Sequence, residues 1–99
     1  MMKIKQKGIA GTLESSDVLV VVSPHNEDKI KLILQSKVEK QYGDSIKKTV
    51  ISTLSKCGVV SALVDVRDQG ALDCVIKARV ETAVYRAADE KKVKFGELS

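Results

Sequence analysis

The stretch Val18-Leu19-Val20-Val21-Val22 decides the fold, because it is an unbroken apolar run in which four of the five residues are β-branched. β-Branched side chains lose little freedom in a strand and pack well on a pleated surface. This run is the strongest strand signal in the chain. It therefore fixes one strand of a sheet, from which the neighbouring elements can be placed.

Two further strands flank this run. Ile4 to Leu13 is a candidate strand, which Gly8 and Gly11 weaken. The polar break between it and the valine run, residues 14–17, has the length of a hairpin loop. On the other side, a turn at residues 23–26 precedes an alternating strand over residues 29–34. Its apolar residues share one face and are Ile30, Leu32 and Leu34.

After Ser36 the apolar period becomes helical. The spacing of Val38 and Tyr42 predicts a short helical segment, which Gly43 interrupts. Asp44 or Ser45 then caps a firmer helix, which ends at Gly58 in a left-handed conformation. The inward stripe predicted for this helix is Ile46, Val50, Ile51 and Leu54.

The last third predicts a strand over Val59 to Val66, a turn over residues 67–70 and a helix over Ala71 to Ala88. The residues expected to face inward on this helix are Leu72, Val75, Ile76, Val80, Ala83, Val84 and Ala87. The order is thus β-β-β-α-β-α. A strand–helix–strand unit favours parallel pairing. We expect an α+β fold, a two-layer sandwich in which two helices cover a four-stranded mixed sheet.

Length and composition limit the function. The 99 residues, 10.8 kDa, form one domain over residues 1–99, with residues 89–99 as a loosely held tail. One His and two Cys leave little material for a metal centre or a His-dependent active site. His25 follows Pro24 in a turn and is expected at the surface. The composition is that of a protein that assists chemistry performed elsewhere.

The remaining polar residues have ordinary structural explanations. Asp65, Asp68 and Asp73 are interpreted as helix caps and surface charge, and the two cysteines as reduced packing residues. The formal charge of +4 is spread along the chain among only three aromatic residues, which speaks against a nucleic-acid surface. No apolar stretch has the length of a signal peptide or a membrane span. We therefore expect a cytoplasmic protein that binds neither membrane nor nucleic acid.

One polar stretch remains, Gly11-Thr12-Leu13-Glu14-Ser15-Ser16-Asp17. By turn chemistry alone it is a hairpin tip. Two adjacent hydroxyls flanked by carboxylates on an exposed loop would also suit covalent modification by another enzyme. The residues by themselves favour the hairpin tip, because a pattern of serines and carboxylates on a loop is not specific to modification.

Residues 10–17 resemble the signature of the citrate lyase acyl carrier protein family, also called the gamma chain of citrate lyase. Two further stretches are similar to that family. One is Val38-Glu39-Lys40-Gln41-Tyr42-Gly43-Asp44, and the other is Asp68-Gln69-Gly70-Ala71-Leu72-Asp73-Cys74, followed by Ala78-Arg79-Val80-Glu81. Together the three motifs span nearly the whole chain.

The resemblance implies a non-catalytic carrier subunit. Ser15 would carry a 2′-(5″-phosphoribosyl)-3′-dephospho-coenzyme A group through a phosphodiester. Ser16 is the alternative site one residue away, and no metal is required. Gly11, Thr12, Leu13, Glu14, Ser16 and Asp17 would form the turn that the attachment enzyme recognises.

The implied partners are the citrate lyase alpha chain, which exchanges acetyl for citryl, and the beta chain, which cleaves the citryl thioester to oxaloacetate. A prosthetic-group transferase and an acetylating ligase would prepare the carrier. Three alternatives stay open: the acyl carrier subunit of malonate decarboxylase, a small basic nucleic-acid-binding domain, and a bare protein-interaction module.

Overall fold

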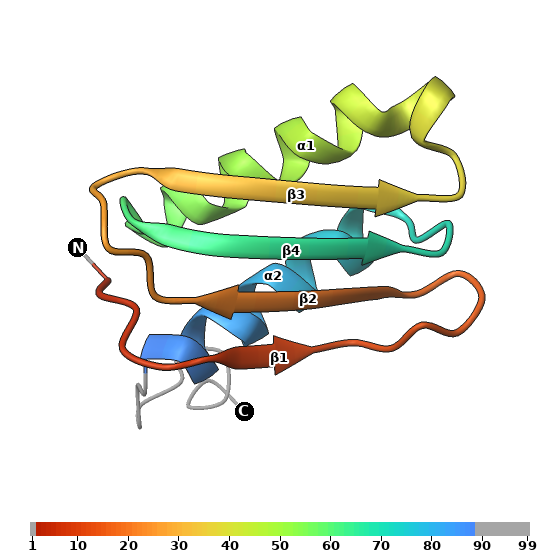
Figure 1. Cartoon of the computed structure of the whole chain (residues 1–99). Coiled ribbons are helices and arrows are strands. Elements are labelled where there is room, and N and C mark those ends of the chain that lie inside the picture. The colour runs from red at the N-terminus through yellow and green to blue at the C-terminus, as the bar shows by residue number, and fades with distance from the viewer. Residues whose placement is uncertain (1, 89–99) are drawn as a thin grey trace.

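The computed structural model describes residues 2–88, and the predicted loose tail at residues 89–99 lies outside the described part. The elements follow the predicted order β-β-β-α-β-α (Figure 1). Their bounds are β1 Gly8–Ala10, β2 Val18–Ser23, β3 Ile30–Ser36, α1 Glu39–Lys56, β4 Ala62–Asp68 and α2 Asp73–Ala88.

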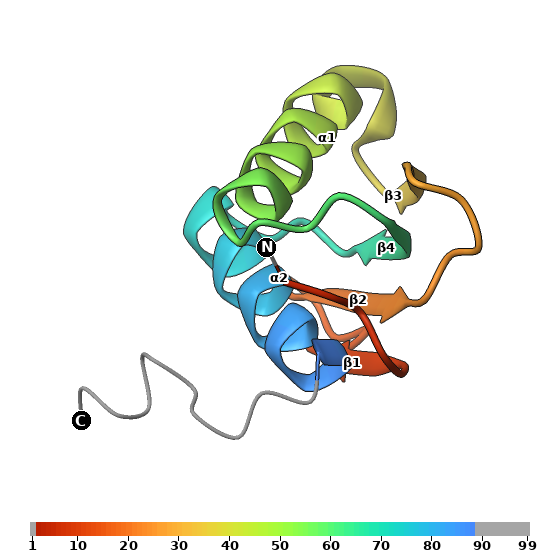
Figure 2. The same ribbon diagram turned by 90° about the vertical axis from the view of Figure 1, so that its left-hand side faces the viewer.

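The four strands form one mixed sheet in the order β1-β2-β4-β3. β2 pairs antiparallel with both β1 and β4, whereas β3 and β4, which α1 connects, are parallel. Both helices lie on the same side of this sheet, and the other side is left open (Figure 2). The predicted two-layer α+β sandwich is confirmed.

The valine run forms an inner strand of the sheet and anchors its core. Val18, Val20 and Val22 are fully buried, and residues between them face the open side of the sheet. β4 alternates in the same way, with Ala62, Val64 and Val66 inward. The core thus consists mostly of β-branched residues on two neighbouring strands, closed by the apolar stripes of the helices.

The first strand is shorter than predicted, since only Gly8–Ala10 pairs with β2. The chain before it is held by α2 instead: the backbone N–H groups of Lys5 and Gln6 both donate to the carbonyl of Ala87, at 2.9 and 3.0 Å. At Gly8 an added Cβ would lie 2.2 Å from the Ala83 carbonyl oxygen. Glycine therefore lets β1 approach α2 closely.

Helix α1 runs without interruption through Gly43, so the prediction of a break there and of a cap at Asp44 or Ser45 is wrong. The helix starts after Val38, whose N–H donates to Ser36 Oγ at 3.1 Å. The buried stripe of α1 outweighs the roughly 1 kcal/mol that a helical glycine costs. Gly58 ends the helix with a φ of 78°, as predicted.

Two predicted inward residues are exposed. Ile51 on α1 is 42% exposed, because the buried stripe continues through Thr53 instead. Leu72 precedes the first residue of α2 and is exposed, so its side chain lies outside the buried stripe. Strand β4 and helix α2 also each begin two or three residues later than predicted.

No helix in residues 2–88 is long and apolar enough to cross a membrane.

Candidate functional site

The loop 11–17 connects β1 to β2 at one end of the sheet. The β3–α1 and β4–α2 connections lie at the same end (Figure 1). Three loops from distant parts of the sequence therefore surround the predicted modification site.

The tip of the loop is a tight turn over residues 14–17. The Asp17 N–H donates to the Glu14 carbonyl at 3.1 Å, which leaves Ser15 and Ser16 at the corner. Both serines are exposed. Within residues 2–88 neither hydroxyl takes part in a hydrogen bond, so both are available to an external enzyme. Ser16 has a φ of 66°, a left-handed conformation that is uncommon for any residue except glycine.

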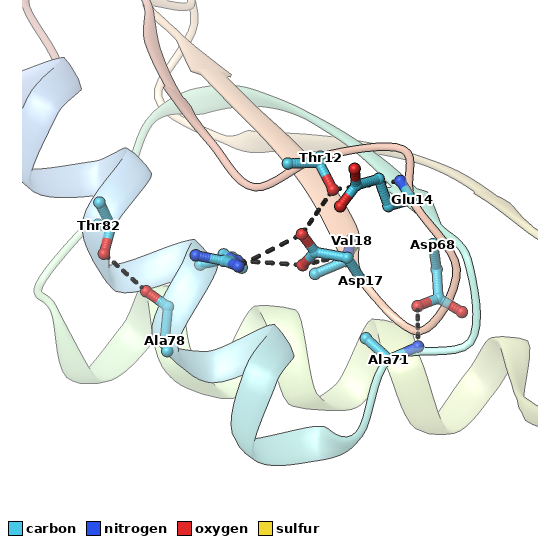
Figure 3. A network of polar contacts seen from close by, with 9 residues as sticks. Thr12, Glu14, Asp17, Val18, Asp68, Ala71, Ala78 and Thr82 are labelled. Atoms are coloured by element: carbon cyan, nitrogen blue, oxygen red, sulfur yellow. Dashed lines mark hydrogen bonds and ion pairs between the residues drawn. The ribbon is translucent and has the colours of Figure 1, made fainter.

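The Asp17 carboxylate organises the loop (Figure 3). Thr12 Oγ1 donates to Asp17 Oδ2 at 2.7 Å, and the Val18 N–H donates to Oδ1 at 2.8 Å. Arg79 on α2 donates to both oxygens, from Nε at 3.1 Å and from Nη2 at 3.3 Å. Together these groups, the Thr12 hydroxyl foremost, lower the pKa of Asp17 to about 2, against the opposing effect of burial.

The turn is also bound to the β4–α2 connection. The Ser16 N–H donates to the Gln69 carbonyl at 2.8 Å, and the Gln69 N–H donates to the Asp17 carbonyl at 2.9 Å. These two bonds continue the β2–β4 pairing beyond Val18 and Asp68. The backbone at Ser16 and Asp17 is thus held by the sheet.

The connection after β4 is itself fixed by Asp68, whose side chain is buried. Its carboxylate accepts from Ser36 Oγ at 2.8 Å and from the N–H groups of Gly70 and Ala71 at 3.1 and 2.9 Å. Asp68 therefore joins the ends of β3 and β4 to the start of α2. It supports the segment on which the serine turn rests.

At the base of the loop, Gly11 has a φ of 89°, and an added Cβ would lie 1.8 Å from the Val18 carbonyl oxygen. The chain can enter the loop along this path only with glycine at position 11.

All seven predicted residues, 11–17, lie in this one loop, but they contribute unequally to the hydrogen bonds that hold it. Thr12 and Asp17 build the side-chain network, whereas Leu13 and Glu14 are exposed. Glu14 contributes its backbone: its N–H donates to Thr12 Oγ1 at 3.1 Å, and its carbonyl accepts from the Asp17 N–H. The sequence interpretation assigned no role to Arg79 or Gln69 in the site. Both residues lie in the stretches that resemble the carrier family, but that resemblance gives no indication that Arg79 pairs with a residue 62 positions away.

The other candidate groups do not assemble into a reactive centre. Within residues 2–88 there is no group of three or more His, Cys, Asp or Glu side chains that could hold a metal ion. His25 is half-buried rather than at the surface, and it lies in the connection after β2, at the other end of the sheet. Cys74 is exposed rather than packed, whereas Cys57 is partly buried. The site is an accessible hydroxyl on a turn that backbone and side-chain hydrogen bonds hold in place.

Comparison with known proteins gives a consistent result. The sequence model of the family described as Malonate decarboxylase delta subunit (MdcD) matches residues 5–87. The chain is 49% identical to the citrate lyase acyl carrier protein of Vibrio cholerae serotype O1 (strain M66-2), over 99% of this chain and 100% of that one. It is 47% identical to the protein of the same name from Lacticaseibacillus casei, over 99% and 96% of the two chains.

Among solved structures, a chain from the crystal structure of a Pseudomonas malonate decarboxylase hetero-tetramer in complex with malonate superposes with a TM-score of 0.68. The two chains are 20% identical, and the match covers 85% of this chain and 89% of that one. At this identity the likeness concerns the fold.

Proposed function

Because the chain belongs to the family of citrate lyase acyl carrier proteins and malonate decarboxylase delta subunits, we propose that it is the acyl carrier subunit of a citrate lyase, with Ser15 as the attachment site. The observation that carries the proposal is the exposed turn at residues 14–17, which Arg79 and Gln69 hold by hydrogen bonds. It presents a free hydroxyl on a rigid support, as a covalently loaded carrier requires.

The residues of the turn suit a phosphodiester-linked group such as 2′-(5″-phosphoribosyl)-3′-dephospho-coenzyme A. Ser15 Oγ would attack the phosphorus of an activated donor and displace that donor's phosphate leaving group, while its proton would pass to a base of the attachment enzyme. Such a group supplies a thiol for acyl thioesters, and this chain supplies the position of that thiol. Neither Cys57 nor Cys74 is needed for the chemistry.

The backbone favours Ser15 over Ser16. The Ser16 N–H is bonded to Gln69, and its φ of 66° is held by the surrounding loop. Ser15 precedes this contact and has no positive φ.

The proposed role explains the sparse inventory of reactive side chains. The alpha chain would exchange acetyl for citryl on the carrier, and the beta chain would cleave the citryl thioester to oxaloacetate. Both steps would take place in the cytoplasm. Tethering raises the effective concentration of the acyl group to roughly millimolar for a flexible link. A transferase and an acetylating ligase would prepare the carrier.

A second candidate is the acyl carrier subunit of malonate decarboxylase, which the family description and the similar fold both favour. Identities of 47–49% to citrate lyase carriers, against 20% to the malonate decarboxylase chain, support the first candidate. Reconstitution with the partner chains of each enzyme distinguishes them: acetate formed from citrate supports the first, and decarboxylation of malonate supports the second.

The attachment site is tested by producing the chain together with its attachment enzymes and recording the intact mass. We expect the wild type and Ser16→Ala to gain the mass of the group, and Ser15→Ala to remain unloaded. Loading of Ser15→Ala combined with an unloaded Ser16→Ala would move the site by one residue. An unloaded wild type, in a reaction that loads a known citrate lyase carrier, would overturn the carrier proposal.

A further inference from the structure

We propose that a groove beside the serine turn receives the arm attached at Ser15, with its phosphates on lysine and arginine side chains and its thiol end against Leu72, Tyr42 and Cys74. This inference rests on the proposed function. It adds a binding site for the arm on the carrier itself, which the arm would occupy when it is not bound to a partner chain.

The apolar part of the groove lies between the first turns of α1 and the start of α2. It is a hollow of about 600 Å³, within the range of small-molecule sites. Its apolar lining includes Val38, Tyr42, Ile46, Ala71, Leu72 and Cys74. Leu72 is 71% exposed and Tyr42 is 56% exposed, although both are large apolar side chains. Exposed apolar surface gathered around a hollow typically marks a binding site.

A basic part adjoins this hollow and leads back to the serine turn. One hollow of about 340 Å³ runs from Leu13, in the loop of Ser15, past Lys37, Arg67 and Gln69. Another joins Lys37 to Lys40 and shares Val38 with the apolar part. The Asp68 carboxylate between them is already bonded to Ser36, Gly70 and Ala71. The three hollows adjoin one another through shared lining residues, Lys37 between the first two and Val38 between the last two, and follow from the loop past three basic side chains to an apolar end.

The chemistry along this path suits the proposed arm. One phosphate joins the arm to Ser15 and the pyrophosphate follows beyond two riboses, where Lys37, Lys40 and Arg67, which also lies 3.7 Å from Asp65, supply charge-assisted donors. The largely uncharged chain and its thiol come last, where the lining is apolar. Gln69 bonds to Ser16 and Asp17, and residues 70–74 continue directly into the apolar lining. A group fixed at Ser15 thus starts at the mouth of the groove.

Loaded protein of verified mass allows a test that does not depend on enzyme activity. In ¹H–¹⁵N spectra of the loaded and unloaded chain, we expect shift changes at Val38, Tyr42, Ile46 and Leu72 as well as in the loop. Ile33 and Leu63, on the open face of the sheet, should not change. Changes confined to residues 11–17 and Gln69 in a fully loaded sample would overturn the groove and leave the carrier function standing.

Cys74 provides a second readout. In a Cys57→Ala background, glutathione disulfide should convert the arm thiol and Cys74 into one intramolecular disulfide, releasing two molecules of glutathione. The equilibrium with glutathione gives the effective concentration of the arm at Cys74. We expect Leu72→Asp to lower it about threefold or more by removing apolar contact. Val60→Asp, at another exposed apolar position (50% exposed) in the α1–β4 connection, should leave it unchanged.

Two lysine double variants, one in the groove and one outside it, test the basic part of the groove. Lys37→Gln with Lys40→Gln should lower the same effective concentration, whereas Lys31→Gln with Lys56→Gln, which removes two charges elsewhere, should not. If the two groove variants, like the two control variants, retained the wild-type effective concentration at Cys74, the arm would not bind in the groove and the proposal would be wrong.

Discussion

Arg79 Nε lies 3.1 Å from Asp17 Oδ1, so a side chain in the middle of α2 holds the turn that presents Ser15, across 62 positions of sequence. The ion pair is partly exposed at Arg79, at 42% of its side chain, and mostly buried at Asp17, at 15%. Since Asp17 also accepts from Thr12 and Val18, loss of the arginine removes one of the three groups bonded to this carboxylate.

Coupling between Asp17 and Arg79 is therefore expected in a double-mutant cycle. Asp17→Asn and Arg79→Met, singly and together, should give a coupling of about 1 kcal/mol in the free energy of unfolding by urea. The matched control is Asp65→Asn with Arg67→Met, whose atoms lie 3.7 Å apart on the open face and whose coupling should stay below about 0.5 kcal/mol. Equal coupling in the two cycles would show that the Asp17 pair is an ordinary surface contact.

Lowering the pH should reduce the stability of the folded chain, because Asp17 becomes protonated. The pKa of this carboxyl is about 2 in the folded chain, against about 3.9 for an unfolded aspartate. The native state thus binds fewer protons, so the contribution of Asp17 is complete above about pH 4 and is lost as the pH falls towards 2.

Urea unfolding of the wild type and Asp17→Asn at several pH values measures this contribution. The wild type should be the more stable at about pH 5, and the difference should narrow steadily towards about pH 2.5. A difference that stayed constant over this range would mean that ionisation of Asp17 does not stabilise the fold.

Gly11 and Gly70 form a matched pair, because both have a φ near 90° and only one is crowded. Gly11→Ala brings a Cβ against the Val18 carbonyl and should cost more than about 3 kcal/mol, from strain and clash together. At Gly70 nothing lies within 4 Å, so Gly70→Ala should cost about 1 kcal/mol from backbone strain alone. Thermal unfolding of the two variants gives the comparison, and similar losses would contradict the close approach at Gly11.

Replacement of Ser16 by glycine is expected to stabilise the fold. Its φ of 66° is strained for serine, so Ser16→Gly should raise the free energy of unfolding by up to about 1 kcal/mol. Ser15→Gly, at the neighbouring position without a positive φ, should lower it instead. If Ser15 is the attachment site, Ser16→Gly should still be loaded, which intact mass reports directly.

Local pattern predicted much of this molecule. The valine run, the alternation at Ile30, Leu32 and Leu34, and the left-handed end of α1 at Gly58 all follow from neighbouring residues. The order β-β-β-α-β-α then limited the packing to a sheet covered by helices. Boundaries were less accurate: α1 passes through Gly43 because burial of its stripe exceeds the propensity cost of one glycine.

By itself the sequence determined which elements form and which loop carries the adjacent serines, because turn chemistry and apolar period act over a few residues. Only the tertiary structure decided that Arg79 and Gln69 hold the turn, that Asp68 joins β3, β4 and α2, and that Leu72 faces a groove instead of the core. These contacts join residues far apart in the chain. Their partners depend on how the strands register and the helices pack, which no local pattern specifies.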